Sequence, residues 1–129
     1  MGTVERVHEI LVVEDNSDAR ETLCLLLELE GYRVAAAETG EQGVELAREN
    51  TFTIALIDIG LPDVDGYSVA QRIRSSPSGT GLVLIALTGY SEPEDVRRAR
   101  EAGFDAHLVK PVDPDTLTKT LADLTADRR

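Results

Sequence analysis

Four largely apolar runs of this sequence end in residues whose side chains can take part in chemistry. The runs cover residues 10–13, 54–57, 82–87 and 107–109. The residues that end them are Glu14 with Asp15, Asp58, Thr88, and Lys110 with Pro111. If the runs are parallel strands of one sheet, their carboxyl ends lie at a single edge, which is where ligands bind in open α/β sheets. Three acids, one hydroxyl and one amine would then meet in one place.

The three acids predict a site for a divalent cation. Two carboxylates about 4 Å apart repel by about 4 kcal/mol at an effective dielectric constant of about 20. Glu14, Asp15 and Asp58 would therefore need a proton or a cation in order to share one site. A hard ion with oxygen ligands fits, and Mg²⁺ is the expected one. Because Mg²⁺ keeps positions for water or phosphate oxygens, such a site would bring a phosphoryl group beside a carboxylate.

Asp58 is the candidate nucleophile toward phosphorus. A carboxylate can form an aspartyl phosphate, and Asp58 is the lone acid at the end of the presumed central strand. Lys110 and the metal ion would neutralise charge on the transferring group, and the Thr88 hydroxyl would donate a hydrogen bond to a phosphoryl oxygen. Each residue alone could have an ordinary role, as a loop acid, helix cap, β-former or solvated lysine. The joint pattern favours phosphoryl transfer.

The segments between these residues predict alternating strands and helices. We expect strands at about 9–13, 33–38, 53–58, 82–88 and 106–109, and helices at about 17–30, 40–50, 67–75, 93–102 and from 114 onward. Gly31 and Gly103 are placed to end two helices. Thr39 with Gln42 fits a capping box, and residues 91–94 fit another cap. Five strand–helix units with right-handed crossovers predict a three-layer α/β sandwich with helices on both faces of the sheet.

The bulk composition predicts one globular domain and argues against several partners. The chain has 129 residues, of which 42% are hydrophobic, and its core is expected at about 9–125. The net charge of −11 argues against direct binding to nucleic acid, because phosphate backbones require basic patches. No apolar stretch approaches the ~20 residues of a membrane span. No signal-peptide pattern opens the chain. We therefore expect a cytoplasmic protein without membrane contact, either stand-alone or part of a larger kinase.

The same residues match a known family. The motifs are residues 13–16 (Val-Glu-Asp-Asn), residues 58–62 (Asp-Ile-Gly-Leu-Pro) with Asp65 and Gly66, residues 87–89 (Leu-Thr-Gly) and residues 108–111 (Leu-Val-Lys-Pro). Over residues 10–124 the chain resembles the receiver domains of two-component response regulators. Any one motif is weak, but the four together are specific.

The resemblance implies a flavodoxin-like (βα)5 fold, with a parallel five-stranded sheet in the order 2-1-3-4-5. It implies that Asp58 accepts a phosphoryl group from a histidine kinase or a histidine phosphotransfer domain in a Mg²⁺-dependent reaction. The implied site has Asp15, Asp58 and the Gly60 carbonyl as Mg²⁺ ligands, Glu14 acting through water, Lys110 beside the phosphoryl group, and a cis peptide bond between Lys110 and Pro111. The chain would catalyse its own phosphotransfer and dephosphorylation without being a classical enzyme.

Three positions depart from the commonest family pattern. His107 stands where the family usually has the switch Tyr or Phe, and Gly89 replaces the common Ala after the switch residue Thr88. Gly60 has no side chain beside the phosphoryl group, which affects the lifetime of the phosphorylated state. His107 could rotate between exposed and buried states and make the switch sensitive to pH, since a free imidazole titrates near ~6.5. Alternatively, it only fills a strand end.

The helix at 93–102 is predicted to move and to signal. Its apolar positions, Val96, Ala99 and Ala102, bury little area and anchor it weakly. Three arginines make it a basic element of an acidic protein. We expect it to form an output face toward an unidentified downstream protein, together with strand 106–109 and the last helix. The alternative is an ordinary solvated helix.

The first helix carries more leucine than one apolar stripe requires. Leu25 and Leu29 lie on a line of their own and could dock a helical phosphodonor, although a broad core stripe would also account for them. Cys24, the only cysteine, is expected to be a small buried hydrophobic residue.

Three other functions fit the sequence less well. A phosphatase of the haloacid dehalogenase type would need an acid at position 60, where the chain has Gly60. A flavodoxin would need a phosphate loop after the first strand, where Glu14 and Asp15 would repel the phosphate. A receiver-like interaction module without phosphorylation remains open, although the complete set of acids and Lys110 argues against it.

Overall fold

The computed structural model of the chain describes residues 8–89 and 93–125. Within these residues, five parallel strands form one sheet in the order β2-β1-β3-β4-β5. The strands are β1 (Glu9–Val13), β2 (Arg33–Ala37), β3 (Ile54–Asp58), β4 (Val83–Thr88) and β5 (Ala106–Val109). The predicted strand order is confirmed, and each strand lies within one residue of its predicted bounds.

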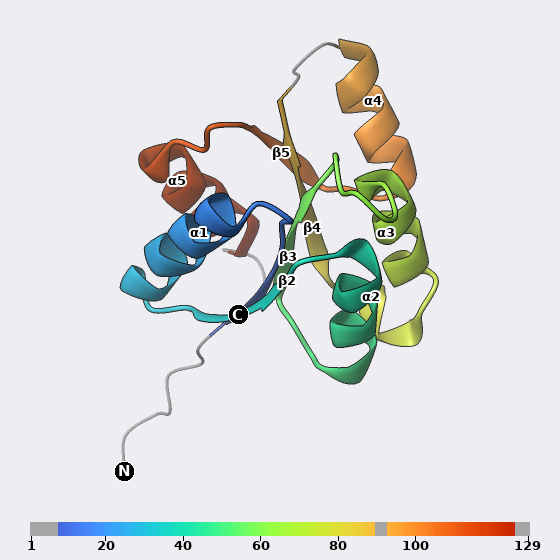
Figure 1. Ribbon diagram of the computed structural model, residues 1–129, viewed down its shortest axis with the longest axis horizontal. Helices are drawn as coiled ribbons and strands as arrows, with labels where there is room; N and C mark the ends of the chain where they lie inside the picture. The colour runs from blue at the N-terminus through green and yellow to red at the C-terminus, as the bar shows by residue number, and fades with distance from the viewer. Residues whose placement is uncertain (1–7, 90–92, 126–129) are drawn as a thin grey trace.

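Helices cover both faces of this sheet (Figure 1). One face carries α1 (Ser17–Leu29) and α5 (Pro114–Thr125), and the other carries α2 (Gly40–Glu49), α3 (Gly66–Arg74) and α4 (Pro93–Ala102). A short 3-10 helix, η1 (Pro77–Gly79), precedes β4 where the sequence predicts an irregular connection. The layers are therefore those of the predicted three-layer α/β sandwich.

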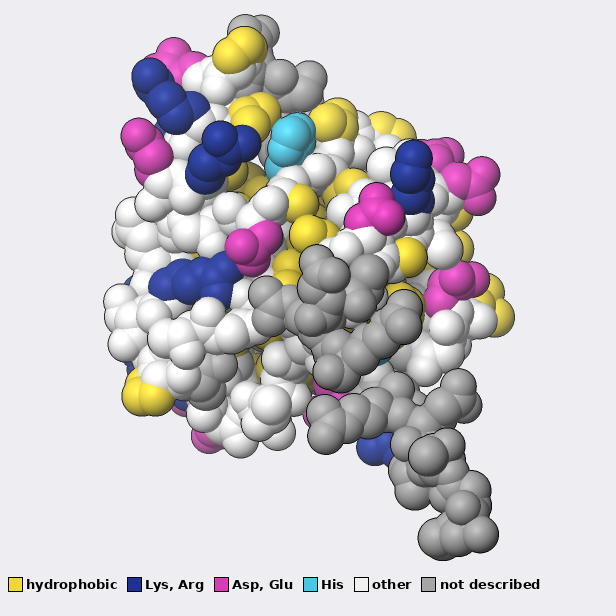
Figure 2. Space-filling view, turned by 180° about the vertical axis from the view of Figure 1, so that it is seen from behind, with side chains coloured by type: hydrophobic (Ala, Val, Ile, Leu, Met, Phe, Trp, Pro, Cys, Tyr) yellow, Lys and Arg dark blue, Asp and Glu magenta, His cyan; other side chains and the backbone are white. Residues whose placement is uncertain are grey.

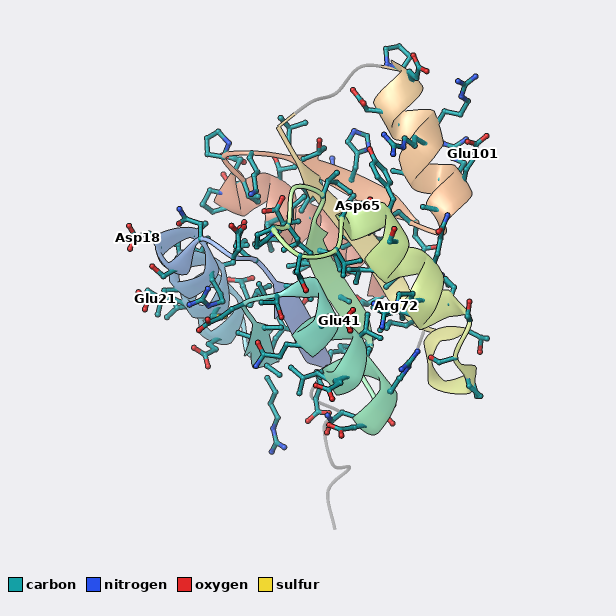
Figure 3. The ribbon with its side chains drawn as sticks, turned by 45° about the vertical axis from the view of Figure 1, so that its right-hand side comes forward. Asp18, Glu21, Glu41, Asp65, Arg72 and Glu101 are labelled. Carbon is teal, nitrogen blue, oxygen red and sulfur yellow. The ribbon has the colours of Figure 1, made fainter. Side chains whose placement is uncertain are left out.

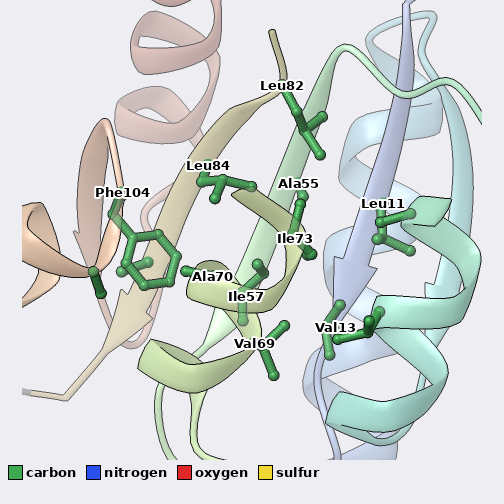
Figure 4. Packing of buried hydrophobic residues seen from close by; sticks show 14 of the residues in the cluster. Leu11, Val13, Ala55, Ile57, Val69, Ala70, Ile73, Leu82, Leu84 and Phe104 are labelled. Atoms are coloured by element: carbon green, nitrogen blue, oxygen red, sulfur yellow. The ribbon is translucent and has the colours of Figure 1, made fainter. Parts of the chain in front are cut away.

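The central strands supply apolar residues to two cores. β3 and β4 are buried along their whole length because helices cover both of their faces. On the side of α2 to α4, Ile57 and Leu84 pack with Val69, Ile73 and Phe104 (Figure 4). Alternate strand residues point to the opposite face, where they pack against leucines of α1 and α5. The ends of the strands are thus held on both sides, and the polar residues that follow them start from fixed positions.

Side-chain caps start several helices directly after the strands. Asn16 accepts a hydrogen bond from the Ala19 N–H (2.9 Å) at the start of α1. Asp65 accepts one from the Ser68 N–H (2.9 Å) at the start of α3, and Asp113 caps α5 in the same way. These caps satisfy backbone donors that have no partner within the helix. They keep the loops at the carboxyl edge of the sheet short.

The capping box predicted at the start of α2 forms only in part. Thr39 accepts a hydrogen bond from the Gln42 N–H (3.1 Å), as predicted. The Gln42 side chain, however, accepts from the Glu38 N–H (2.9 Å) instead of the Thr39 N–H. Asp63 supplies further acceptors for the Gly40 and Glu41 amides (2.9 and 3.0 Å). A contact from a distant loop thus satisfies backbone N–H groups at the start of α2 that the local capping box leaves without a partner. The cap predicted at 91–94 includes two residues outside the described ranges.

Two glycines end helices as predicted. Gly31 follows α1 with φ of 95°, and Gly103 follows α4 with φ of 110°, a region that favours glycine. Gly103 also contacts α3. Its carbonyl accepts hydrogen bonds from Nε and Nη2 of Arg74, the last residue of that helix (3.0 and 2.8 Å). Among the described helices, none is both long and apolar enough to span a membrane.

Candidate functional site

The ends of three strands bring an ammonium group between two carboxylates. The Nζ atom of Lys110, which follows β5, lies 2.8 Å from Oε1 of Glu14 and 3.0 Å from Oδ2 of Asp58. Glu14 directly follows β1, and Asp58 is the last residue of β3. The predicted convergence of these three residues is therefore observed.

Glu14 is an acid held inside the protein. Its side chain is 0% exposed. Its Oε2 atom accepts a hydrogen bond from the Asn16 N–H (3.2 Å). Its Oε1 atom lies beside the Lys110 ammonium, but in a direction unsuited to a hydrogen bond, and it receives no hydrogen bond from the described residues. A buried carboxylate oxygen without a hydrogen bond can still accept one or bind a cation.

Burial and charge act in opposite directions on these three groups. Burial raises the pKa of Glu14 above its ordinary value, and contact with Asp58 adds to this, while Lys110 only partly offsets it. Burial also opposes ionisation of Asp58, but its contacts with Glu14, the Gly60 amide and Lys110 outweigh it and lower its pKa. The pKa of Lys110 is raised, because contacts with both acids outweigh its burial. Asp58 is thus the carboxyl that stays ionised and Glu14 the one that holds a proton more readily.

Asp15 completes an acidic group that fits Mg²⁺. Oxygen atoms of Glu14, Asp15 and Asp58 lie within 4.8 Å of one another, and Asp15 is exposed while the other two are buried. Carboxylate oxygens are the ligands that Mg²⁺ prefers, with water or phosphate oxygens in its other positions. Gly60 donates its N–H to Oδ1 of Asp58 (3.0 Å), so the loop after β3 folds back over the acid. The Gly60 carbonyl stays a predicted ligand.

The loop after β3 closes tightly on the strand. Gly66, the first residue of α3, donates its N–H to the Ile59 carbonyl (2.9 Å). A Cβ atom at this position would lie 2.5 Å from the Asp58 carbonyl oxygen, so only glycine fits without movement of the backbone. Residue 66 thereby sets how closely α3 approaches the end of β3, and with it the position of Asp58.

The two predicted switch residues line one small cavity. Thr88 ends β4 and is buried, and His107 lies half-buried on β5. Both border a cavity of about 10 Å³ beneath α4, which is room for about one water molecule. The Thr88 carbonyl accepts a hydrogen bond from the Lys110 N–H (2.8 Å), so the end of β4 is joined to Lys110 through the backbone. The Lys110–Pro111 peptide bond is cis, as predicted.

The contacts of two arginines and one tyrosine near the site are not predicted from the sequence, although Arg98 is among the three arginines expected to make its helix basic. Arg20 of α1 donates hydrogen bonds to the carbonyls of Glu14 (3.0 Å) and Asp15 (3.3 Å), and thereby holds the loop that carries the acids. Tyr67 of α3 lies under the guanidinium of Arg98 of α4, with 4.3 Å between the guanidinium carbon and the ring centroid. None of the three residues belongs to a capping motif or ends a strand. Their roles depend on contacts between separate elements, which a local pattern does not indicate.

The basic character predicted for α4 is offset on the helix itself. Arg97 lies 3.7 Å from Glu94, and Arg98 covers Tyr67. In the space-filling view, acidic and basic side chains mix at the end of the molecule where α4 lies, beside hydrophobic side chains and a histidine (Figure 2). The expected output face is therefore mixed in charge rather than basic.

Known proteins share both the sequence pattern and the fold. The sequence model of the family described as response regulator receiver domain matches residues 10–122. A 14.6 kDa protein of Leptolyngbya boryana is 38% identical over 106 residues, which cover 82% of this chain and 81% of that protein. The virulence sensor protein BvgS of Bordetella pertussis is 33% identical over 122 residues, which cover 91% of this chain. The chain spans only 10% of the length of BvgS.

A solved structure of a receiver domain shares the fold of this chain. The receiver domain of the sensor histidine kinase PA1611 from Pseudomonas aeruginosa has a magnesium ion coordinated in its active-site cleft. It superimposes with a TM-score of 0.87 at 32% identity, covering 95% of this chain and 100% of that one. Since the family model spans most of the sequence and the sheet order is that of the family's fold, the protein belongs to the response regulator receiver domains.

Proposed function

We propose that Asp58 is the phosphoacceptor of this receiver domain and that residues 1–129 act as a single signalling module. The observation that carries the proposal is the position of Lys110, whose ammonium lies within 3.0 Å of the Asp58 carboxylate and within 2.8 Å of Glu14. A nucleophilic carboxylate needs to remain ionised while it faces a phosphoryl group, and the lowered pKa of Asp58 meets that need.

In the proposed reaction, an oxygen of Asp58 attacks the phosphorus of a phosphohistidine. The new O–P bond forms as the P–N bond breaks, and the electron pair of that bond returns to the imidazole. Lys110 turns toward the phosphoryl oxygens and offsets their charge. Asp15, Asp58 and the Gly60 carbonyl would hold Mg²⁺, with Glu14 acting through water, and the bound ion would supply further positive charge. The Thr88 hydroxyl then donates a hydrogen bond to a phosphoryl oxygen.

The proposed partners are a histidine kinase or histidine phosphotransfer domain and an unidentified downstream protein. The likeness to a receiver domain of a sensor histidine kinase supports the first. The face formed by α4, β5 and α5 would carry the signal to the second. We also propose that the domain acts in the cytoplasm, without direct contact to nucleic acid or membrane, and that it catalyses only its own phosphorylation and dephosphorylation.

The direct test uses beryllofluoride, which imitates a phosphoryl group on a carboxylate. With Mg²⁺ present, we expect a change in the amide NMR spectrum of the wild-type domain around Thr88 and α4. Asp58→Asn should show no such change, because an amide cannot act as the anionic ligand of beryllium. Equal spectra for wild type with and without beryllofluoride would support the alternative of an interaction module that is not phosphorylated.

A groove beside the site suggests where the phosphodonor docks. It has a volume of about 540 Å³ and runs from Lys110 and Pro111 along α1 past Thr22 and Leu26. The apolar excess predicted for α1 is observed, because Leu25 is 58% and Leu29 is 73% exposed. Asp18 and Glu21 project from the same helix into solvent (Figure 3).

Leu25 does not line this groove, but it lies one turn along α1 from Thr22, which does. Leu25→Asp should slow phosphotransfer from a phosphorylated histidine domain by about tenfold, because a charge at the rim of a docked interface mainly affects association. Thermal stability should stay near that of wild type, since the side chain is exposed. Leu29→Asp, one turn farther from Lys110 on the same helix, is the matched control and should change the rate less. Transfer at the wild-type rate in Leu25→Asp would remove α1 from the docking surface.

A further inference from the structure

The helix α4 is held at its C-terminal end and at its middle by different kinds of contact. At its C-terminal end, Arg74 of α3 donates hydrogen bonds to the Gly103 carbonyl and forms an ion pair with Asp105 (2.7 Å). The Leu84 N–H of β4 donates to the same Asp105 carboxylate (2.9 Å), so this end of α4 is tied to the sheet. The buried side chains of α4 itself are the small ones of Ala99 and Ala102.

Residues nearer the middle of α4 make contacts of another kind. Val96 is half-buried and borders the cavity of about 10 Å³ that Thr88 and His107 also line. One contact that joins the middle of α4 to α3 is the guanidinium of Arg98 over the ring of Tyr67, at 4.3 Å. Tyr67 lines the same cavity, so one residue borders the cavity of Thr88 and His107 and contacts α4.

Tyr67 belongs to a part of the protein that is firmly placed. It follows Gly66, whose contact with the end of β3 leaves no space for a side chain, and α3 is joined to α2 by the ion pair of Arg72 with Glu41 (2.6 Å; Figure 3). A movement of α4 relative to the sheet must therefore change the distance between Arg98 and Tyr67. A contact that exists in one of two states biases the equilibrium toward that state by its own free energy.

We propose that the Tyr67–Arg98 contact holds α4 in its unphosphorylated position and opposes the switch. This inference rests on the proposed function, because it assigns a regulatory contact to the same phosphorylation site. When Thr88 and His107 rearrange toward a phosphorylated Asp58, the cavity beneath α4 changes shape, and Arg98 leaves the Tyr67 ring. A substitution that removes the contact therefore shifts the equilibrium of α4 toward the switched state. A contact of this type corresponds to about two- to fivefold in the equilibrium constant.

The test compares two variants that remove the contact with two that keep it. Arg98→Gln removes the cation and Tyr67→Leu removes the ring, whereas Tyr67→Phe keeps the ring. Arg97→Gln, the neighbouring arginine on the same helix, is the charge-matched control. Two quantities are measured on the full chain: amide hydrogen exchange of α4 without any phosphoryl analogue, and the beryllofluoride concentration that gives half the maximal spectral change at saturating Mg²⁺.

We expect Arg98→Gln and Tyr67→Leu to increase exchange in α4 and to lower the half-maximal beryllofluoride concentration by about two- to fivefold. Tyr67→Phe and Arg97→Gln should match wild type, and the double variant Arg98→Gln/Tyr67→Leu should show no more than either single change. Wild-type behaviour of Arg98→Gln, or the same shift in Arg97→Gln, would overturn the proposal. If wild type itself does not respond to beryllofluoride, the proposed function fails, while exchange in α4 still decides whether the contact holds the helix.

Discussion

Replacement of Lys110 by methionine should destabilise the metal-free domain by about 3 kcal/mol at neutral pH. The change leaves Glu14 and Asp58 close together without their common cation, and removal of one partner of a buried ion pair costs about 3–5 kcal/mol. We expect the lower end of that range because 32% of the Lys110 side chain is exposed. Chemical denaturation in the presence of EDTA measures the effect.

Mg²⁺ should restore much of this stability, because the ion takes over the charge that the lysine supplied. Saturation at 100 times the dissociation constant adds about 2.7 kcal/mol, and the variant should bind Mg²⁺ more tightly than wild type does. Lys119→Met is the matched control, since Lys119 is exposed on α5, and its stability should stay near that of wild type. Equal unfolding free energies for Lys110→Met and wild type in EDTA would contradict the ion pairs described here.

Mg²⁺ binding should weaken as the pH falls, and Glu14 should be the main cause. Burial raises the pKa of this carboxyl above its ordinary value of 4.5, so the metal-free folded protein keeps the Glu14 proton to a higher pH than the unfolded chain does. A group of this kind favours the folded state below its ordinary pKa, and that contribution is lost as the pH rises through the raised value. Mg²⁺ must displace the proton, so its affinity rises with pH over the same interval and then levels off.

Calorimetric titration with Mg²⁺ between pH 5 and pH 8 measures this dependence. Competition with one proton changes the affinity by up to about tenfold per pH unit below the raised pKa. Glu14→Gln should weaken Mg²⁺ binding and flatten the pH profile, whereas Glu101→Gln, an exposed acid on α4, should leave both unchanged. A profile for Glu14→Gln as steep as that of wild type would place the titrating group elsewhere.

The sequence predicts the strands and the acids at their ends because these depend on local patterns. Apolar runs in strands covered on both faces, such as β3, are continuous and easy to recognise, and the residue after such a run has a fixed place at the sheet edge. For this reason the pattern places Glu14, Asp58 and Lys110 at the same edge of the sheet, where the structure brings them together. The order of the strands comes from the family resemblance, since alternation alone permits several orders.

The contacts that tune the site are not predictable in the same way. Arg74 reaches Gly103 and Asp105 across about thirty residues of sequence, and nothing in its own segment indicates these partners. The same holds for Arg98 and Tyr67, which belong to neighbouring helices. At the capping box of Thr39, the Gln42 side chain accepts from the Glu38 N–H, and Asp63 from a distant loop binds the amides of Gly40 and Glu41. Local sequence patterns predict the secondary structure of each segment, whereas the contacts between distant segments depend on how the segments pack.

Identification of the phosphorylated residue tests the central claim most directly. The full chain is incubated with acetyl phosphate and Mg²⁺, treated with borohydride to convert an aspartyl phosphate into a stable alcohol, and digested for mass spectrometry. The account predicts the modification at Asp58, dependent on Mg²⁺ and absent from Asp58→Asn. Modification at a different residue of the wild-type chain, or none at Asp58 with Mg²⁺ present, would contradict it.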